Sequence, residues 1–141
     1  MDYLSFEVEN QRFAISIASV LRVTWAVAVT ILPDSPSTTL GVVNIHGNIV
    51  PVINVRHVLR QPSREMEPTD KLIFCCVDGH EFALWADNII GIASVEALPS
   101  DTPPPSIVHA GHVQAMLEIN HQLTVVYDWA ALLQEGAKIQ G

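Results

Sequence analysis

Charge of either sign is scarce in this sequence, and positive charge is the scarcer. Only 16% of the 141 residues are charged, and 15 acidic residues against seven basic ones give a net charge of −8. A surface with this balance repels phosphate backbones and anionic lipid headgroups, which argues against nucleic acid or a membrane surface as a partner. Apolar residues make up 49% of the chain, so it can bury a substantial core.

Long apolar runs and a secretory signal are also missing. No apolar segment approaches the roughly 20 residues of a membrane-spanning helix. The opening MDYLSF lacks a basic run followed by a long apolar stretch, so we expect no signal peptide. Cys75 and Cys76 are adjacent in a strand-like segment and should point to opposite faces, so we do not expect them to bridge each other. They read as small buried thiols in a reducing cytoplasm.

Patterns for catalysis or metal binding are a third absence. The sequence has no nucleophile-elbow serine and no glycine-rich phosphate loop, and its six histidines are scattered. His109 and His112 have a spacing that suits two ligands on a helix, but PPPSIVHAGHV is too rich in proline and glycine to favour one. No cysteine or carboxylate lies beside them at ligand spacing. We therefore expect no catalytic residue, no metal and no cofactor.

What the sequence does contain is an internal repeat. The segment VENQRFAISIASVLRV (8–23) aligns without a gap with VDGHEFALWADNIIGI (77–92), at a shift of 69 residues, and half of the aligned positions are apolar in both copies. At a shift of 74, GNIVPVINVRHVL (47–59) aligns with HQLTVVYDWAALL (121–133). The difference of five indicates a longer connection in the second copy, where the run of prolines at 103–105 favours an extended segment.

Each copy, of about 70 residues, shows the same order of strand signals. A hairpin, a further strand, a polar loop with proline and a second hairpin follow one another. Turns are expected at ENQR (9–12), Asp78-Gly79, 46–48 and 120–122. Short helices are expected at 54–60 and, with Asp128 as a cap, at 128–135. We predict a mostly β fold over 1–141, made of two small barrels with approximate halves 1–69 and 70–141 that either pack together or share strands.

Two strand-like segments, KLIFCCV (71–77) and NIVPVINV (48–55), are apolar on both faces. Such strands are either buried between two layers or carry an exposed binding face, and both interpretations stay open. The same alternatives apply to Trp25, Trp85 and Trp129, for which core packing is the expected role and a binding surface the other. Surplus apolar strand surface without catalytic residues favours an interaction module over an enzyme.

The segment GVVNIHGNIVPVINVRHVL (41–59) resembles the signature of the CheW family of chemotaxis adaptors. That signature is a Gly-Val-x-Asn-Leu-Arg-Gly run, three further residues and Pro-Val/Ile-x-Asp-Leu-Arg. The residues that stand in matching places are Gly41, Val42, Asn44, Gly47, Pro51, Val52 and Arg56. The hairpins at 3–23 and 78–92 and the closing VVYDWAALL are also similar, so the resemblance spans nearly the whole chain. It implies two SH3-like five-stranded barrels with a short C-terminal helix.

The resemblance also implies a function, namely a non-catalytic cytoplasmic adaptor in chemotaxis or a related motility pathway. Its partners would be the cytoplasmic tip of a chemoreceptor and the regulatory domain of a CheA-like histidine kinase. The receptor-facing positions that it implies are Val20, Arg22, Gly41, Asn44, His46 and Gly47. Three residues depart from the family pattern, which usually has Glu at Arg22, Arg at His46 and Asp at Asn54. The family's Glu and Arg are both implicated in coupling.

A second surface, facing the kinase, is expected on residues 72–98, because the family packs this barrel against a barrel of the kinase. Exposed apolar side chains with few charges should form its centre. The candidates are Leu72, Phe74, Phe82, Leu84, Ile89 and Ile90. The alternative function is a divergent regulatory or ligand-sensing interaction domain that has lost its coupling to a kinase.

Overall fold

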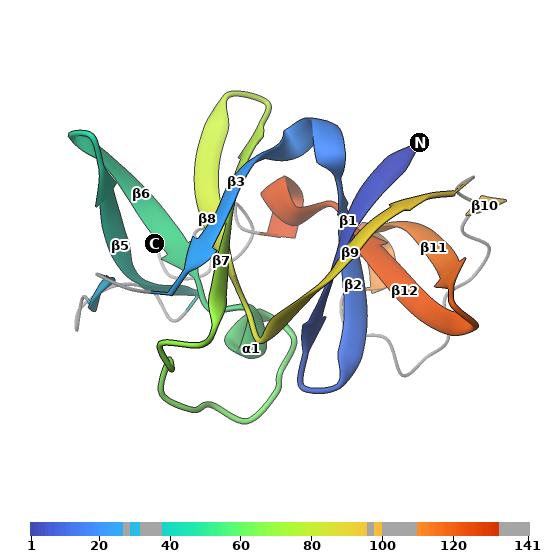
Figure 1. Ribbon diagram of the computed structural model, residues 1–141, viewed down its shortest axis with the longest axis horizontal. Coiled ribbons are helices and arrows are strands. Elements are labelled where there is room, and N and C mark those ends of the chain that lie inside the picture. Colours follow the sequence, from blue (N-terminus) through green and yellow to red (C-terminus); the bar gives the residue numbers. More distant parts are fainter. Residues whose placement is uncertain (27–28, 32–37, 96–97, 100–109, 133–141) are drawn as a thin grey trace.

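The computed structural model describes residues 1–141 except 27–28, 32–37, 96–97, 100–109 and 133–141. Two sheets lie side by side along the longest axis (Figure 1). Sheet 1 contains, in spatial order, β10 (Leu98–Pro99), β11 (Val113–Ile119), β12 (Gln122–Tyr127), β2 (Gln11–Ser16), β1 (Asp2–Val8) and β9 (Asn88–Ser94). Sheet 2 contains β4 (Thr30–Ile31), β5 (Thr39–Ile45), β6 (Asn48–Ile53), β8 (His80–Ala86), β7 (Lys71–Val77) and β3 (Val20–Trp25).

Each sheet therefore has five strands of six or seven residues and one strand of two residues. The predicted fold class, mostly β with two SH3-like barrels, is confirmed. The helical elements are short, namely the 3-10 turns η1 (Ile17–Ser19) and η2 (Ala110–His112), the helix α1 (Val55–Val58) and a helical turn at 129–132. The helix expected at 128–135 is described only as far as 132, and the proline run at 103–105 lies outside the described residues.

The internal repeat is visible in the order of the strands. Counted from its two-residue strand, sheet 1 runs β10-β11-β12-β2-β1-β9 and sheet 2 runs β4-β5-β6-β8-β7-β3, so elements related by the repeat occupy the same places. In both sheets the pairing is antiparallel except where β12 meets β2 and β6 meets β8. Each sheet combines the opening hairpin of one copy with the later strands of the other. The sheets consequently do not coincide with the halves 1–69 and 70–141.

The four hairpin turns are at the predicted places, and all have the same backbone conformation. Both central residues of each turn have positive φ, which is the type I′ geometry that matches the right-handed twist of paired strands. These residues are Glu9 and Asn10, His46 and Gly47, Asp78 and Gly79, and Asn120 and His121.

The core lies between the sheets as well as inside them. One buried cluster takes Phe6 and Phe13 from sheet 1, Ile73 and Leu84 from sheet 2, and further side chains from α1 and the 129–132 turn. A second cluster fills sheet 2 and a third fills sheet 1. The strand β7 supplies alternate residues to two of these cores, because successive side chains of a strand point to opposite faces. The segment KLIFCCV is thus apolar on both faces because both faces are buried.

Candidate functional site

Three of the expected receptor-facing residues lie together at the turn between β5 and β6. Asn44, His46 and Gly47 are all exposed, and the Oδ1 atom of Asn44 accepts a hydrogen bond of 2.8 Å from the backbone N–H of Gly47. This bond ties the end of β5 to the turn and leaves the His46 imidazole in solvent. The hairpin projects at one end of the long axis of the molecule (Figure 1).

Gly41 does not belong to this exposed surface, contrary to the expectation. It is buried in β5, where it pairs with Ile31 of the short strand β4. A Cβ atom at this position would overlap the carbonyl oxygen of Thr30. The glycine is therefore required for the close approach of β4 to β5, and its role is structural.

The other two expected residues, Val20 and Arg22, lie on β3. Val20 is half-buried and packs against the core between the sheets, whereas Arg22 is exposed, with its guanidinium carbon 5.9 Å from the ring centroid of Phe74. Three strands, β7, β8 and β6, separate β3 from β5 in the order of sheet 2. The six expected residues thus form a group at the β5–β6 turn, a group on β3 and the buried Gly41.

An apolar stripe on β3 was missed by the sequence reasoning. Leu21, Val23 and Trp25 alternate along the strand and are exposed, Trp25 by 57%. The expectation that Trp25 is a core residue is wrong, although Trp85 and Trp129 are buried as expected. The Nζ atom of Lys71 lies 3.7 Å from the Trp25 ring centroid. The alternation of these apolar residues with polar ones could have indicated the stripe. The sequence does not show that the stripe is exposed, because this depends on β3 being the last strand of its sheet.

Four of the six residues expected to face the kinase are core residues. Phe82 and Leu84 fill the core between the sheets, and Leu72 and Phe74 fill the core of sheet 2. None of the four is more than 2% exposed, so none can contact a partner. The expectation was wrong because it treated a strand that is apolar on both faces as having one exposed face. Both faces of β7 and β8 are covered by the two cores.

The remaining apolar surface of this region is on β9, the last strand of sheet 1. Ile89 and Ile90 are half-buried, and the neighbouring Ile92 is 66% exposed. The strand β9 has a bulge at Ile90, because Ser5 of β1 pairs with Gly91 and Phe6 pairs with Ile89. Bulges of this kind redirect side chains at sheet edges. The exposed apolar centre expected in 72–98 is therefore reduced to one end of β9.

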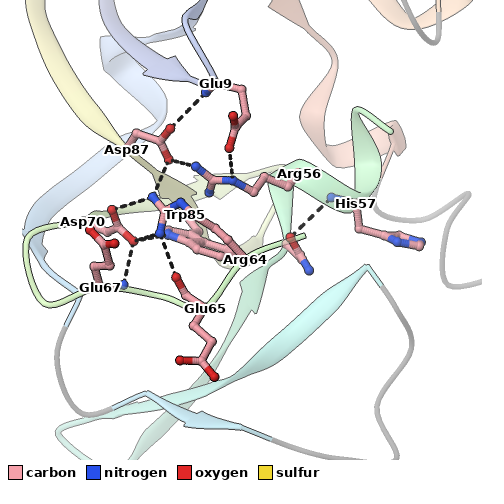
Figure 2. A network of polar contacts seen from close by, with 10 residues as sticks. Glu9, Arg56, His57, Arg64, Glu65, Glu67, Asp70, Trp85 and Asp87 are labelled. Atoms are coloured by element: carbon pink, nitrogen blue, oxygen red, sulfur yellow. Dashed lines mark hydrogen bonds and ion pairs between the residues drawn. The ribbon is translucent and has the colours of Figure 1, made fainter. Parts of the chain in front are cut away.

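A buried arginine connects the two sheets on the side of α1. Arg56 of α1 is fully buried, and its Nε atom lies 2.7 Å from an oxygen of Glu9 in the β1–β2 turn (Figure 2). Its Nη2 atom pairs with Asp87, which stands between β8 and β9. The guanidinium carbon lies 4.6 Å from the ring centroid of Trp85. The Nη1 atom is buried and has no hydrogen-bond partner among the residues that the structure describes.

A second arginine extends this network along the connection that leads to β7. Arg64 donates two hydrogen bonds of 2.8 Å to Asp70 and one of 3.0 Å to Asp87 (Figure 2). Burial alone would raise the pKa of Asp70, but hydrogen bonds from Arg64, the Glu67 backbone and the Trp85 indole outweigh it and lower that pKa. The hydrogen bond to Asp70 in turn raises the pKa of Arg64. Asp70 is thus held as a buried carboxylate.

Sequence reasoning could not find this network as a unit. Arg56 matched the family signature, but its partners Glu9 and Asp87 are distant in the sequence and stand at turn-like positions where acidic residues are common. Only the pairing of β1 with β9 brings them to one place.

The described residues offer little for catalysis or metal binding. No group of three or more His, Cys, Asp or Glu side chains that could hold a metal is present among them, and His109 lies outside them. Both cysteines are free, and burial raises the pKa of the Cys75 thiol to about 12, so it stays protonated at neutral pH. Cys76 is only half-buried. No helix in the described ranges is long and apolar enough to cross a membrane.

Comparisons with known proteins agree on one family. The family model described as CheW-like domain matches residues 2–137. A probable chemotaxis protein CheW of Rhizobium etli is 25% identical over 138 residues, which are 95% of this chain and 88% of that protein. The chemotaxis protein CheW of Helicobacter pylori is 30% identical over 56 residues, 40% of this chain and 34% of that protein. The crystal structure of the scaffolding protein TtCheW from Thermoanaerobacter tengcongensis has a TM-score of 0.81, with 20% identity, covering 93% of this chain and 86% of that one.

Proposed function

The chain belongs to the family of CheW-like domains, and we propose that it is a non-catalytic cytoplasmic adaptor that couples a chemoreceptor to a CheA-like histidine kinase. The pathway would be chemotaxis or a related form of motility. The observation that carries the proposal is the match of the family model to residues 2–137, which is nearly the whole chain. The surfaces described above support it, because exposed apolar strands suit a binding module.

The kinase-facing surface of the proposal is centred on Ile92, with Ile89 and Ile90 beside it. An apolar side chain that is 66% exposed on an end strand can be covered by a partner without disturbing the fold. The receptor-facing surface comprises the β5–β6 turn and the exposed face of β3. Arg22 and His46 there replace the family's usual Glu and Arg, so this chain would select a receptor of different local charge.

Binding to the regulatory domain of a CheA-like kinase from the same organism tests the proposal. We expect Ile92→Glu to weaken this binding by about 2 kcal/mol, because a charge would be placed in a desolvated contact. The matched control is Leu123→Glu, which puts the same charge in place of another exposed apolar side chain, on β12. Both variants should keep the melting temperature of the wild type. Absence of binding by the wild-type chain would overturn the adaptor function itself.

Receptor binding is tested at the other surface. We expect His46→Ala to weaken binding to the cytoplasmic fragment of the receptor roughly tenfold, as loss of a central contact does. His121→Ala is the control, because His121 is exposed in the repeat-related β11–β12 turn. Equal effects of the two substitutions would contradict the assignment of the β5–β6 turn.

A pocket favours the alternative, a regulatory or ligand-sensing domain without kinase coupling. It lies where β2 and β12 begin, with a volume of about 400 Å³, which is within the range of small-molecule sites. Its buried lining is apolar and aromatic, and its rim carries the guanidinium of Arg12 and four carboxamides, from Asn10, Gln11, Gln61 and Gln122. A small polar ligand bound there, in a chain that binds no kinase, would favour this alternative.

A further inference from the structure

The internal repeat provides a built-in comparison for the buried network around Arg56. At the shifts of the two repeats, Arg56 corresponds to Ala130, Asp87 to Ala18 and Glu9 to Asp78. The helical turns that contain Arg56 and Ala130 both begin with a side chain that caps the turn. The Oδ1 atom of Asn54 accepts a hydrogen bond of 3.3 Å from the N–H of His57, and that of Asp128 accepts one of 3.2 Å from the N–H of Ala131.

The comparison shows that this junction can be built without the arginine and without the carboxylate of Asp87. Ala130 is buried in the position that corresponds to Arg56, yet the 129–132 turn packs against the core between the sheets as α1 does. Buried ion pairs are expensive to desolvate, and apolar side chains of similar volume often replace them without loss of stability. The buried Nη1 atom of Arg56, which has no hydrogen-bond partner in the described part of the chain, adds to the cost. Stability alone therefore does not account for the network.

Its location suggests another role. Arg56 lies three residues after β6, the strand that begins at the β5–β6 turn, and Asp87 directly precedes β9, the strand that carries Ile92. Their ion pair is a direct bond between the segments that lead to the two proposed partner surfaces. The Glu9 backbone donates a 2.9 Å hydrogen bond to Asp87, and the Asp87 backbone donates one of 2.9 Å to the Glu7 carbonyl. Asp87, directly before β9, is thereby held through both its side chain and its backbone.

We propose that Arg56 and Asp87 are positioning residues that link the kinase-facing strand β9 mechanically to the receptor-facing β5–β6 hairpin, so that a partner bound at one surface restrains the other. This inference rests on the proposed function. Three links in the described chain carry it: the buried guanidinium, the shared carboxylate of Asp87 and the contact of Glu9 with both.

The test removes the three charges while keeping side-chain volume, in the variant Glu9→Gln/Arg56→Met/Asp87→Asn of the full chain. The matched control is Glu7→Gln/Arg12→Gln, which removes a partly exposed ion pair from the same β1–β2 hairpin. We expect the triple variant to fold with a melting temperature within about 5 °C of the wild type. A triple variant that does not fold, or melts far lower, would show that the network serves the fold, and would overturn the proposal.

The first readout is hydrogen exchange measured by mass spectrometry without any partner. In the triple variant, exchange should accelerate at least tenfold in both 54–60 and 86–94, while 113–127 keeps its protection. The control variant should change neither segment. Unchanged exchange in 54–60 and 86–94 would overturn the link, and this result does not depend on whether the chain binds a kinase.

The second readout adds the regulatory domain of the kinase. Its binding should slow exchange in 54–60 in the wild type and in the control variant, and should leave 54–60 unaffected in the triple variant. Protection of 54–60 that persists in the triple variant would overturn the coupling. If the wild type does not bind the kinase domain, the proposed function fails, and the first readout alone decides whether Arg56 and Asp87 join the two segments.

Discussion

At the scale of single residues, Asp70 is the buried carboxylate on which the second half of the polar network depends. It accepts hydrogen bonds from two nitrogens of Arg64, from the backbone of Glu67 and from the indole of Trp85. We expect Asp70→Asn to lower the free energy of unfolding at pH 7 by about 2 kcal/mol, because hydrogen bonds to a charged group are lost or weakened. Urea unfolding measures this, with the exposed Glu65→Gln as the control.

The pH dependence of the same variant follows from the pKa of Asp70. Because the folded state lowers that pKa, the stabilisation by Asp70 is complete above its ordinary value of 3.8 and is lost as the pH falls below that value, through the folded-state pKa. The wild type should therefore lose stability more steeply than Asp70→Asn below about pH 4. Parallel stability curves for the two proteins down to pH 2 would contradict the assignment.

Gly41 gives a second prediction at this scale. A Cβ atom there would overlap backbone atoms of Thr30, which cannot move aside as the end of a flexible side chain could. We expect Gly41→Ala to cost about 2 kcal/mol of unfolding free energy, within the range for overpacked sites. The control is Gly111→Ala, where a Cβ would meet no atom within 4 Å. Equal stability of the two variants in urea unfolding would show that β4 can move away at little cost.

At the scale of elements, the sequence predicted what depends on local chemistry. The four hairpin turns were found because residues such as Asp78-Gly79 and His46-Gly47 favour positive φ wherever they occur. The burial of the strands was not found, because the apolar pattern of β3 or of β7 does not show which of its faces other parts of the chain cover. The strand β7 lies inside the sheet and is covered on both faces, whereas β3 is the last strand and exposes Leu21, Val23 and Trp25.

The start of α1 carries a prediction about one departure from the family pattern. Asn54 caps this helix through its Oδ1 atom, and an aspartate, usual in the family, could accept the same hydrogen bond. We expect Asn54→Asp to change the free energy of unfolding by less than about 0.5 kcal/mol and Asn54→Ala to lower it by about 1 kcal/mol. Asp128→Ala, at the corresponding cap, should cost a similar amount. A neutral Asn54→Ala in thermal or urea unfolding would mean that packing alone holds α1.

At the scale of the whole molecule, the candidate site was predictable only in part. The exposed β5–β6 turn was found, because a turn needs only its own residues. The network of Glu9, Arg56 and Asp87 was not, because it forms where three distant segments meet. The repeat was readable from apolar spacing, yet it does not show which hairpin joins which sheet, since both hairpins offer similar apolar faces.

The exchange of hairpins between the two sheets predicts how the chain folds as a whole. A fragment 1–69 would contain β6 without its neighbour β8 and the β1–β2 hairpin without β9 and β12, and the fragment 70–141 would have the complementary gaps. The core between the sheets also takes side chains from both fragments, including Phe13 and Leu84.

We therefore expect each fragment alone to give a poorly dispersed NMR spectrum, and an equimolar mixture to recover the spectrum of the intact chain. The cut separates the exposed Thr69 from the buried Asp70, so the contacts of Asp70 with Arg64 and Glu67 have to re-form across the break. In the intact chain, unfolding followed by far-ultraviolet circular dichroism and by tryptophan fluorescence, to which the buried Trp85 and Trp129 contribute, should coincide in one transition. A well-dispersed spectrum from 1–69 alone, or two separate transitions in the intact chain, would show that the halves fold independently despite the shared strands.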